Sequence, residues 1–253
     1  MKPEVGIIGY GRFGRLAAHY LKRWCRVSVA DLHPIRRLEP GVKKTNISGV
    51  AQLRYLILAV PINRLPVTLR RIAPLIGSDT IVFDVASVKE GPMKWMSELL
   101  PKTVSYVGTH PLFGPESAAR SLTEKTIVLC PGRIAPIMYN TLRSSLRRAG
   151  LHIVELTPRE HDRRMASTLF LSQFIGRAVA PFCLPNLVET TESYSFLKLV
   201  SVRASKDTSE LFFDMYKYNR YATRVPSNVL RSVLALTSRL GSRARSHQRR
   251  PGR

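Results

Sequence analysis

The sequence has few cysteines and no long apolar run, and both shortages narrow the classes of protein that it can represent. Its three cysteines lie far apart and show no C-x-x-C spacing, which argues against a disulfide framework and against a structural zinc site. We expect all three to be reduced core residues. No apolar run approaches the length of a membrane span, and the first predicted strand begins within a few residues of Met1. These features favour a soluble, cytoplasmic protein that is not exported.

Acidic residues are scarce as well. The chain of 253 residues has 17 Asp and Glu against 40 Lys and Arg, which gives a formal net charge of +23 at pH 7. Such an excess favours anionic partners: nucleic acid, an acidic membrane surface or a small polyanionic substrate. No basic run alternates with aromatic residues, and no nucleic-acid-binding motif is recognisable. The charge alone therefore does not choose among these partners.

The most informative stretch is the first one. An apolar run over residues 5–8 leads into the turn Gly9-Tyr10-Gly11-Arg12-Phe13-Gly14, and an amphipathic run over residues 15–22 follows. Strand, G-x-G-x-x-G turn and helix in this order form the fingerprint of a dinucleotide-binding Rossmann domain. The alternative is a glycine-rich turn of a parallel sheet that binds nothing.

Each glycine of this turn has its own expected role. Gly9 permits the tight turn, Gly11 lets the backbone approach a pyrophosphate, and Gly14 lets the helix pack against the strand. The free N–H groups at the start of the helix face the phosphates. We expect the whole turn, Arg12 and Phe13 included, to bind the cofactor.

The residue after the second predicted strand, which covers residues 27–30, bears on the choice of cofactor. Asp31 lies roughly 20 residues beyond the glycines, where an acidic residue bonds the ribose hydroxyls and favours NAD over NADP. Arg36 and Arg37 follow closely and could accept a 2′-phosphate instead, so NADP remains possible. A solvated carboxylate at a strand end is the alternative for Asp31.

Apolar runs that alternate with helix-periodic runs predict an α/β fold with a doubly wound parallel sheet. The later predicted strands cover residues 55–61, 80–85, 104–107, 125–130 and 152–156, and predicted helices cover 63–76 and 135–149. Past Pro158 only helices are predicted, over 159–182, 187–204 and 208–223. We therefore expect a Rossmann domain over residues 1–157 and an all-helical domain over 158–240.

The end of the chain has a different composition. Residues 238–253 hold six arginines, no acidic residue and no large apolar residue after Leu240. Because such a segment cannot bury a core, we expect residues 241–253 to form a basic, disordered tail. The tail is either solvated or binds RNA or an acidic partner.

Polar residues follow several of the predicted strands at the point where each one ends. Ligands of doubly wound sheets bind outside the carboxyl ends of the strands. This rule places Val60 and Pro61 beside a bound dinucleotide, and it brings Ser87, Lys89 and His110 to the same crevice.

His110 is the candidate proton acceptor. It is the only histidine that the pattern places at a strand end of the nucleotide-binding sheet, where an imidazole can take a proton from a substrate hydroxyl near neutral pH. His19, His33, His152 and His247 fall on a helix, in a loop, in a later strand and in the tail, and we expect structural or solvated roles for them. Alternatively, His110 makes structural hydrogen bonds only and has no catalytic role.

Two longer motifs follow the glycine turn, Asp84-Val85-Ala86-Ser87-Val88-Lys89 and then Gly108-Thr109-His110-Pro111-Leu112-Phe113-Gly114-Pro115-Glu116-Ser117. In this order they closely resemble the prephenate/arogenate dehydrogenase family of tyrosine biosynthesis. The similarity continues through Glu160-His161-Asp162 and Gly176-Arg177, and more weakly from Asp207 to Asn219. It implies NAD- or NADP-dependent oxidative decarboxylation of prephenate to 4-hydroxyphenylpyruvate, or of arogenate to tyrosine. It also implies a homodimer formed through the helical domain.

The resemblance assigns roles to single residues. His110 matches the catalytic histidine, and Ser87 would hold the substrate hydroxyl or the imidazole in register. Arg203 falls where the family places an arginine that binds the substrate, and a guanidinium grips a carboxylate with two hydrogen bonds. The helix after Glu160-His161-Asp162 usually carries a glutamine and, one turn later, a histidine; here these positions are Leu169 and Gln173. Gln173 can still donate a hydrogen bond to the substrate but cannot carry charge.

The sequence is also compatible with two other functions. Leu169, Gln173 and the basic tail are compatible with a dehydrogenase-like protein that has lost turnover and binds RNA or an acidic partner. A different reductase of the same fold, acting on another small carboxylate, is the third possibility. We favour the enzyme, with a small-molecule substrate, no metal site, no membrane contact and no nucleic-acid partner.

Overall fold

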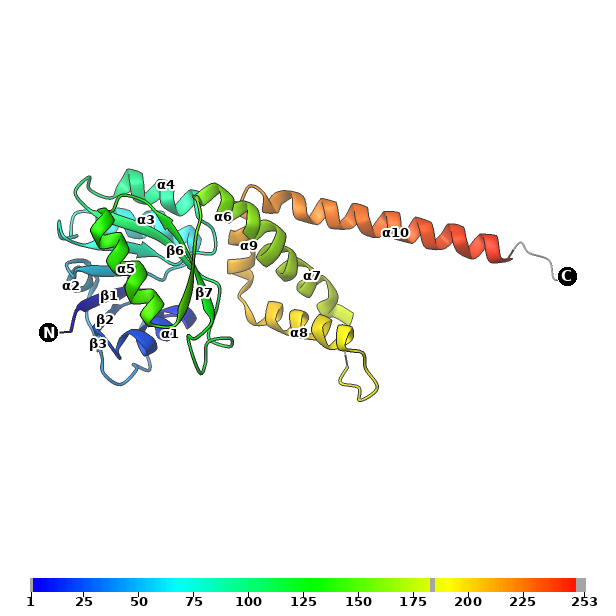
Figure 1. The fold of residues 1–253 in the computed structure, drawn as a ribbon, viewed down its shortest axis with the longest axis horizontal. Coiled ribbons are helices and arrows are strands. Elements are labelled where there is room, and N and C mark those ends of the chain that lie inside the picture. Colours follow the sequence, from blue (N-terminus) through cyan, green and yellow to red (C-terminus); the bar gives the residue numbers. More distant parts are fainter. Residues whose placement is uncertain (1, 183–184, 249–253) are drawn as a thin grey trace. The chain divides into compact units, whose positions relative to one another are not determined.

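The computed structural model describes residues 2–182 and 185–248, with side chains as far as residue 242. The chain divides into two compact units, and the boundary lies between Asp162 and Arg163 (Figure 1). The sequence pattern predicted a boundary after residue 157. The structure keeps the start of the following helix, with His161 and Asp162, in the first unit.

The first unit is built on a sheet of eight strands in the order β3-β2-β1-β4-β5-β6-β7-β8 (Figure 1). Strands β1, β2 and β4 to β6 are parallel, as the doubly wound prediction requires. Strand β3 has only three residues and gave no recognisable pattern. The bounds are β1 Glu4–Ile8, β2 Arg26–Ala30, β3 Val42–Lys44, β4 Tyr55–Leu58, β5 Ile81–Asp84, β6 Ser105–Pro111, β7 Lys125–Pro131 and β8 Leu151–Glu155.

Strand β7 runs antiparallel to β6, which differs from the parallel sheet that the sequence predicted. The connection over residues 112–124 contains no helix, and a parallel return needs a longer crossover that usually contains one. The pairing with β7 also lengthens β6 through Thr109 and His110, which the sequence placed after the strand. His110 pairs with Val128 and lies two residues beyond Gly108, the partner of the last residue of β5.

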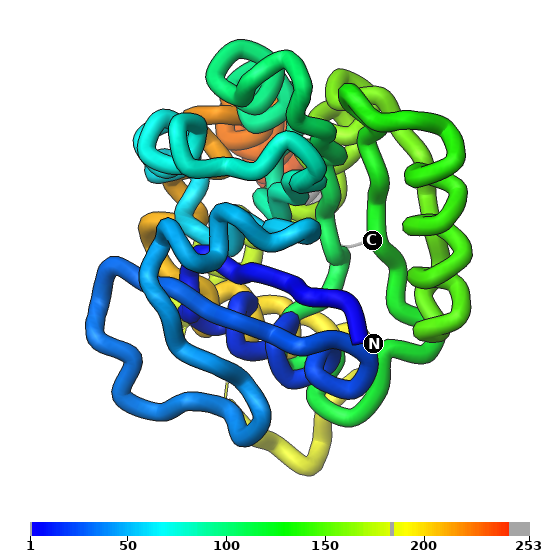
Figure 2. Tube along the Cα trace, turned by 90° about the vertical axis from the view of Figure 1, so that its left-hand side faces the viewer, coloured from blue at the N-terminus to red at the C-terminus, as the bar shows by residue number. Residues whose placement is uncertain are grey.

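Helices cover both faces of this sheet (Figure 2). Helix α1 packs Ala17 and Leu21 against β1 and β2, and α5 packs Met138 and Leu142 on the same face against β5 and β6. Helix α2 covers the opposite face, where a Cβ on Gly6 would lie 2.7 Å from the carbonyl oxygen of Val50. The bounds are α1 Arg12–Leu21, α2 Ile47–Ala51, a 3₁₀ turn Ile62–Arg64, α3 Leu65–Ile72, α4 Glu90–Leu99 and α5 Pro136–Arg148.

The second unit contains only helices in its described part. Its core includes Phe170, whose ring stacks on Phe212 at a centroid distance of 5.2 Å. The helix predicted from residue 187 begins only at Glu192, because the side chain of Thr191 caps it by accepting from the N–H of Tyr194 at 3.2 Å. The bounds are α6 Pro158–Met165, which starts in the first unit, a π-helical turn Ala166–Phe170, α7 Leu171–Val179, 3₁₀ turns Ala180–Phe182 and Ala222–Arg224, α8 Glu192–Lys206, α9 Ser209–Tyr218 and α10 Val225–Gln248.

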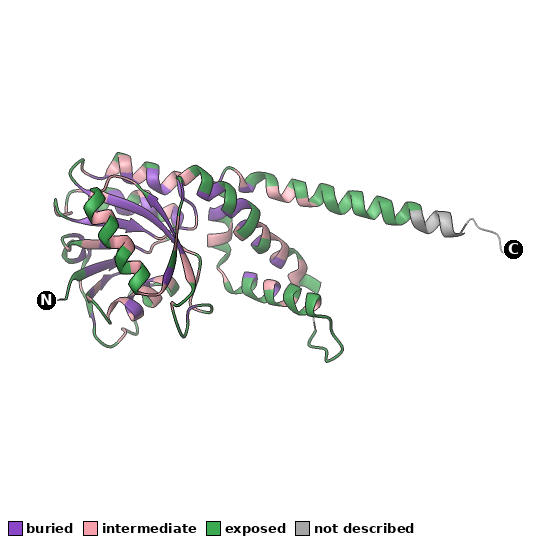
Figure 3. Cartoon of the chain, in the orientation of Figure 1, coloured by how far each residue is buried: buried purple, intermediate pink, exposed green. Residues whose placement is uncertain are grey.

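The last helix replaces much of the predicted tail. Helix α10 has 24 residues and continues to Gln248, where the sequence predicted disorder from residue 241; residues 249–253 lie outside the described part. The prediction considered only the absence of a core and left out the good helix propensity of Ala and Arg. Residues 230–242 are all exposed (Figure 3). No described helix, α10 included, combines the length and apolarity that crossing a membrane requires.

Candidate active site

The glycine turn has the geometry of a phosphate-binding turn. Gly9 has a φ of +95°, and a Cβ there would lie 2.3 Å from the carbonyl oxygen of Ala59. A Cβ on Gly14 would lie 2.0 Å from the carbonyl oxygen of Gly9. A Cβ on Gly11, in contrast, would meet nothing within 4 Å. Two of the glycines are thus required by packing, and the third leaves open the space that a pyrophosphate would occupy.

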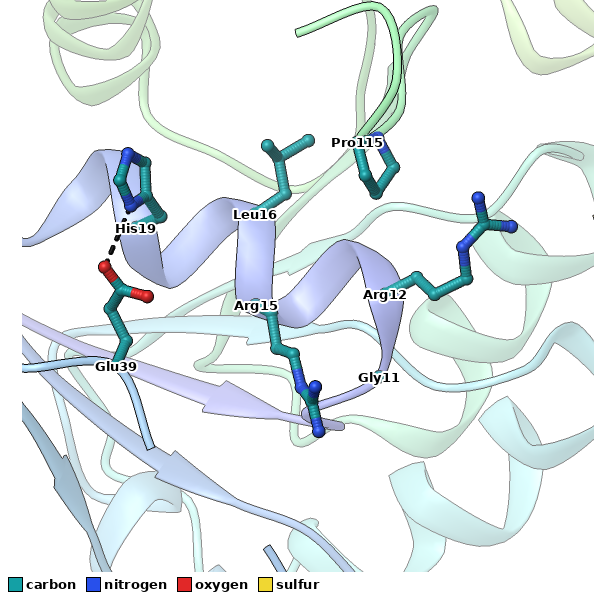
Figure 4. Close-up of a pocket in the computed structure, with 7 residues that line it drawn as sticks. All are labelled: Gly11, Arg12, Arg15, Leu16, His19, Glu39 and Pro115. Carbon is teal, nitrogen blue, oxygen red and sulfur yellow. Dashed lines mark hydrogen bonds and ion pairs between the residues drawn. The ribbon is translucent and has the colours of Figure 1, made fainter. Parts of the chain in front are cut away.

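The start of α1 is suited to an anion. Gly11 precedes the helix without a side-chain cap, and the first turn contains no acidic residue, so its N–H groups are available to a phosphate. Arg12 opens the helix and forms an ion pair with Glu116. A pocket of about 590 Å³ runs along this helix beside Arg15 and His19 (Figure 4). Because His110 does not line this pocket, the pocket does not define the reaction centre.

Asp31, the predicted ribose ligand, lies beside the turn. Its carboxylate accepts the N–H of Tyr10 at 2.5 Å and the N–H of His33 at 2.8 Å, one on each oxygen. A carboxylate has about four acceptor positions, so capacity remains for ribose hydroxyls. Arg36 and Arg37 are exposed in the loop that follows, while Val60 and Pro61 directly follow Ala59, which hydrogen-bonds to the end of β1.

His110 lies at the same edge of the sheet, at the head of a chain of buried hydrogen bonds. Its Nδ1 lies 2.8 Å from Nε2 of His161, and Nδ1 of His161 lies 2.7 Å from Oδ1 of Asp162. His110 is 4% exposed, and His161 and Asp162 are fully buried. The Nε2 atom of His110 has no hydrogen-bond partner among the described residues.

Helix α6 brings His161 to this position because its start is fixed by a capping box. The Thr157 hydroxyl accepts the N–H of Glu160 at 3.2 Å, and a Glu160 carboxylate oxygen accepts the N–H of Thr157 at 3.0 Å. Pro158 is the first residue of the helix, where its missing N–H costs nothing. These local signals set the first turn, and with it the places of His161 and Asp162.

Asp162 is held by the start of another helix. It accepts the N–H of Lys89 at 2.6 Å and the N–H of Glu90 at 2.9 Å, so its carboxylate caps α4. The side chain of Lys89 is fully buried and forms an ion pair with the fully buried Asp84 at the end of β5. A Cβ on Gly108 would lie 2.5 Å from Sδ of Met93 and 3.1 Å from Cδ of Lys89, so glycine leaves room for both side chains.

Burial sets the charge of these groups. Desolvation, followed by the charges of His161 and Lys89, holds the pKa of His110 well below its ordinary value. Desolvation and the charge of Lys89 lower the pKa of His161 to about 3. Burial raises the pKa of Asp84, against the opposing effect of Lys89. Both imidazoles are therefore neutral near pH 7, and a neutral imidazole can accept a proton.

Ser87 is half-buried in the loop after β5, and its hydroxyl has no hydrogen-bond partner in the described part of the chain. It does not bond to His110, whose Nδ1 is taken by His161. The strand-end pattern placed Lys89 in the ligand crevice, but its side chain is fully buried against Asp84, and the pattern gave no role to His161 and Asp162. Lys89 belongs to the motif at residues 84–89, and His161 and Asp162 belong to the segment Glu160-His161-Asp162. No spacing rule links His110 on a strand to His161, 51 positions later on a helix.

Two predicted substrate ligands, Arg203 and Gln173, lie in the second unit. Arg203 is exposed near the end of α8. Gln173 is 8% exposed and donates to a carboxylate oxygen of Asp207 at 2.6 Å, while its own Oε1 is buried without a partner. Arg177 donates to the carbonyl oxygen of Asp207 at 2.8 Å and so supports the same corner.

The fold and the glycine turn define a Rossmann-type nucleotide-binding protein with an additional helical unit. The chain belongs to the prephenate dehydrogenase family, because the family model described as "prephenate dehydrogenase, nucleotide-binding domain" matches residues 17–155, more than half of its length. The resemblance inferred from the sequence is thereby confirmed.

Individual relatives agree with this assignment. The T-protein of Haemophilus influenzae is 29% identical over 214 residues, which are 82% of this chain and 54% of that protein. Arogenate dehydrogenase 1 of Arabidopsis thaliana is 26% identical over 85% of this chain and 36% of its own length. The chain thus spans about half or less of the length of these curated relatives.

Solved structures share the fold. Prephenate dehydrogenase from A. aeolicus, in complex with hydroxyphenyl propionate and NAD⁺, aligns with a TM-score of 0.73 at 16% identity, over 98% of this chain and 93% of that one. Arogenate dehydrogenase from Synechocystis aligns with a TM-score of 0.68 at 22% identity, over 95% and 93% of the two chains. The predicted α/β fold with a helical C-terminal part is confirmed.

Proposed function

We propose that the protein is an NAD(P)-dependent dehydrogenase that oxidises and decarboxylates prephenate to 4-hydroxyphenylpyruvate, or arogenate to tyrosine. The observation that carries this proposal is the neutral, buried His110 at the edge of the sheet where the glycine turn also lies. Membership of the prephenate dehydrogenase family supports it, as do relatives named for both activities.

The residues present suit the reaction. A bound nicotinamide dinucleotide supplies the hydride acceptor. Nε2 of His110 takes the proton of the substrate's ring hydroxyl, and the departure of carbon dioxide leaves an aromatic ring. The hydroxyl of Ser87 has no partner in the described chain and is available to bond the same substrate oxygen. Because aromatisation supplies the driving force, the protein need only position the reactants and remove one proton.

NAD is the cofactor that the residues favour, with NADP as the alternative. The carboxylate of Asp31 would repel a 2′-phosphate and accept the ribose hydroxyls. Its position beside Tyr10, in the glycine turn itself, supports this choice. Comparing kcat/KM for the two cofactors tests it, and Asp31→Asn should shift the ratio toward NADP. If the parent enzyme prefers NADP, Arg36 or Arg37 rather than Asp31 contacts the ribose.

The helical unit supplies the remaining parts of the proposal. Arg203 would bind a substrate carboxylate through its guanidinium, and Gln173 would offer a polar contact to the substrate side chain. We also propose a cytoplasmic homodimer formed through this unit, because α8 and α10 expose large apolar side chains. These include Phe196, Leu199, Leu230, Val233, Leu234 and Leu240.

The decisive experiment is an assay of the purified chain with NAD or NADP and with each substrate in turn. We expect reduced nicotinamide to form with prephenate, arogenate or both, and the steady-state comparison identifies the preferred substrate. Cofactor binding without any turnover of either substrate would overturn the catalytic proposal. Turnover of a different small carboxylate would instead favour another reductase of this fold.

A further inference from the structure

The buried chain of hydrogen bonds has a fixed direction. Asp162 accepts two backbone N–H groups, from Lys89 and Glu90, which identifies it as an ionised carboxylate that can only accept. The nitrogen that faces it, Nδ1 of His161, must therefore carry the hydrogen. A neutral imidazole has one N–H, so Nε2 of His161 is an acceptor.

The position of the hydrogen on His110 follows in the same way. Nε2 of His161 lies 2.8 Å from Nδ1 of His110, so the hydrogen of this bond belongs to His110. Its own Nε2 then has no hydrogen and presents a lone pair. No other described residue bonds to either nitrogen of His110, so nothing opposes this order.

We propose that Asp162, acting through His161, fixes the tautomer of His110, so that its Nε2 is always the nitrogen that can accept the substrate proton. His161 and Asp162 are positioning residues, because they act through His110 and touch no reacting atom. The inference rests on the proposed function and deepens it. The opposite tautomer would present an N–H to the substrate and could not act as a base.

The surroundings make this order stable. The carboxylate is tied to the backbone of α4, the capping box of Thr157 and Glu160 fixes the start of α6, and β7 holds the backbone of His110 in register. Lys89, Asp84 and the Cys130 thiol are also ionisable and buried here; Lys89 and Asp84 pair with each other, and burial raises the pKa of Cys130 to about 12. In the described part of the chain, none of the three bonds to a ring nitrogen of the two histidines.

A matched pair of variants separates tautomer control from packing. His161→Gln keeps an amide oxygen that can accept from Nδ1 of His110 and an amide N–H for Asp162, whereas His161→Leu keeps volume only. We expect the leucine variant to lose much of the roughly 10²–10⁴-fold that general base catalysis contributes, and the glutamine variant to stay within about tenfold of the parent. Equal losses in both variants would mean that packing alone matters.

Nitrogen NMR of the histidine-labelled parent protein tests the tautomer without relying on activity. We expect Nδ1 of His110 to be protonated and Nε2 to be bare at pH 7, with Nε2–H appearing in His161→Leu but not in His161→Gln. A parent protein with Nε2–H on His110 would overturn this inference even if the enzyme is active. An inactive parent with Nδ1–H would overturn the proposed function and leave the tautomer assignment standing.

Discussion

His110 and His161 are held neutral by burial, although Nδ1 of His161 lies 2.7 Å from the carboxylate of Asp162. Asp162 is already committed to the backbone of α4, and Asp84 to Lys89. Protonating either ring would place a cation in a buried site next to the Lys89 ammonium. This arrangement keeps a base available at neutral pH, and it makes the first unit sensitive to acid.

The acid sensitivity can be measured. A histidine with a lowered folded-state pKa binds its proton more readily in the unfolded chain, so stability falls as the pH drops below about 6.5. For His161 the loss continues toward its folded pKa of about 3. We expect His161→Gln to reduce the slope of unfolding free energy against pH by about one proton, or about 1.4 kcal/mol per pH unit, between pH 6 and 4.

The control for this measurement is His33→Gln, because His33 is exposed in the loop after β2. The slope of the control should match the slope of the parent. Chemical denaturation at a series of pH values gives all three curves. Parallel curves for the parent and for His161→Gln would show that His161 does not titrate differently in the folded protein.

Single residues also show how far sequence reasoning reaches. The turn at Gly9 and the close packing at Gly14 were predicted correctly, because the requirements of a tight turn and a close packing are local. His110 was chosen as a candidate because the pattern placed it at the end of a buried strand, although β6 extends through it. The partnership of His110 with His161 and the burial of Lys89 could not be predicted, because they depend on how a helix from a distant part of the chain docks on the sheet.

At the scale of elements, strong periodicity predicted most strands and helices, and tertiary pairing decided the rest. The buried strands β4 and β5 were found within a few residues of their ends. The direction of β7 was missed, because a strand's apolar pattern is the same whichever way it runs. Helix α10 was missed as a whole: no helix was predicted after residue 223, and the composition of its end suggested disorder, although its apolar residues recur at helical spacing.

Helix α10 carries the prediction at this scale. Leu230, Val233, Leu234 and Leu240 are each more than half exposed in the single chain, and they recur at helical spacing. If the homodimer buries this stripe, Leu230→Asp with Leu234→Asp should shift the protein to monomer. Sedimentation velocity measures the change.

Ser232→Asp is the matched control, because Ser232 is exposed on α10 outside the apolar stripe. It should keep the oligomeric state of the parent. A parent protein that sediments as a monomer at high concentration would contradict the dimer. A double variant that remains dimeric would place the interface elsewhere, with α8 as the next surface to examine.

At the scale of the whole molecule, the formal charge of +23 is the dominant property. If the substrate carries two carboxylates, as proposed, such a field would raise its local concentration and accelerate its encounter with the site. Net charge bears on partners and association rates rather than on the fold.

Ionic strength tests this field. We expect kcat/KM for the dianionic substrate to fall as salt rises, because screening weakens attraction beyond the Debye length of about 10 Å at 0.1 M. The value of kcat at saturating cofactor and substrate should change little. A kcat/KM that is independent of salt would mean that the positive charge plays no part in substrate capture and serves some other partner.

The central claim is that His110 is the general base of a dehydrogenase, and one measurement tests it most directly: the turnover of His110→Asn beside that of the parent, with cofactor affinity determined for both. Asparagine keeps a similar shape and a hydrogen-bonding group but cannot take a proton near neutral pH. We predict a fall in kcat of roughly 10²–10⁴ with cofactor affinity nearly unchanged. Turnover close to that of the parent would contradict the account and return the proton acceptor to another residue or to water.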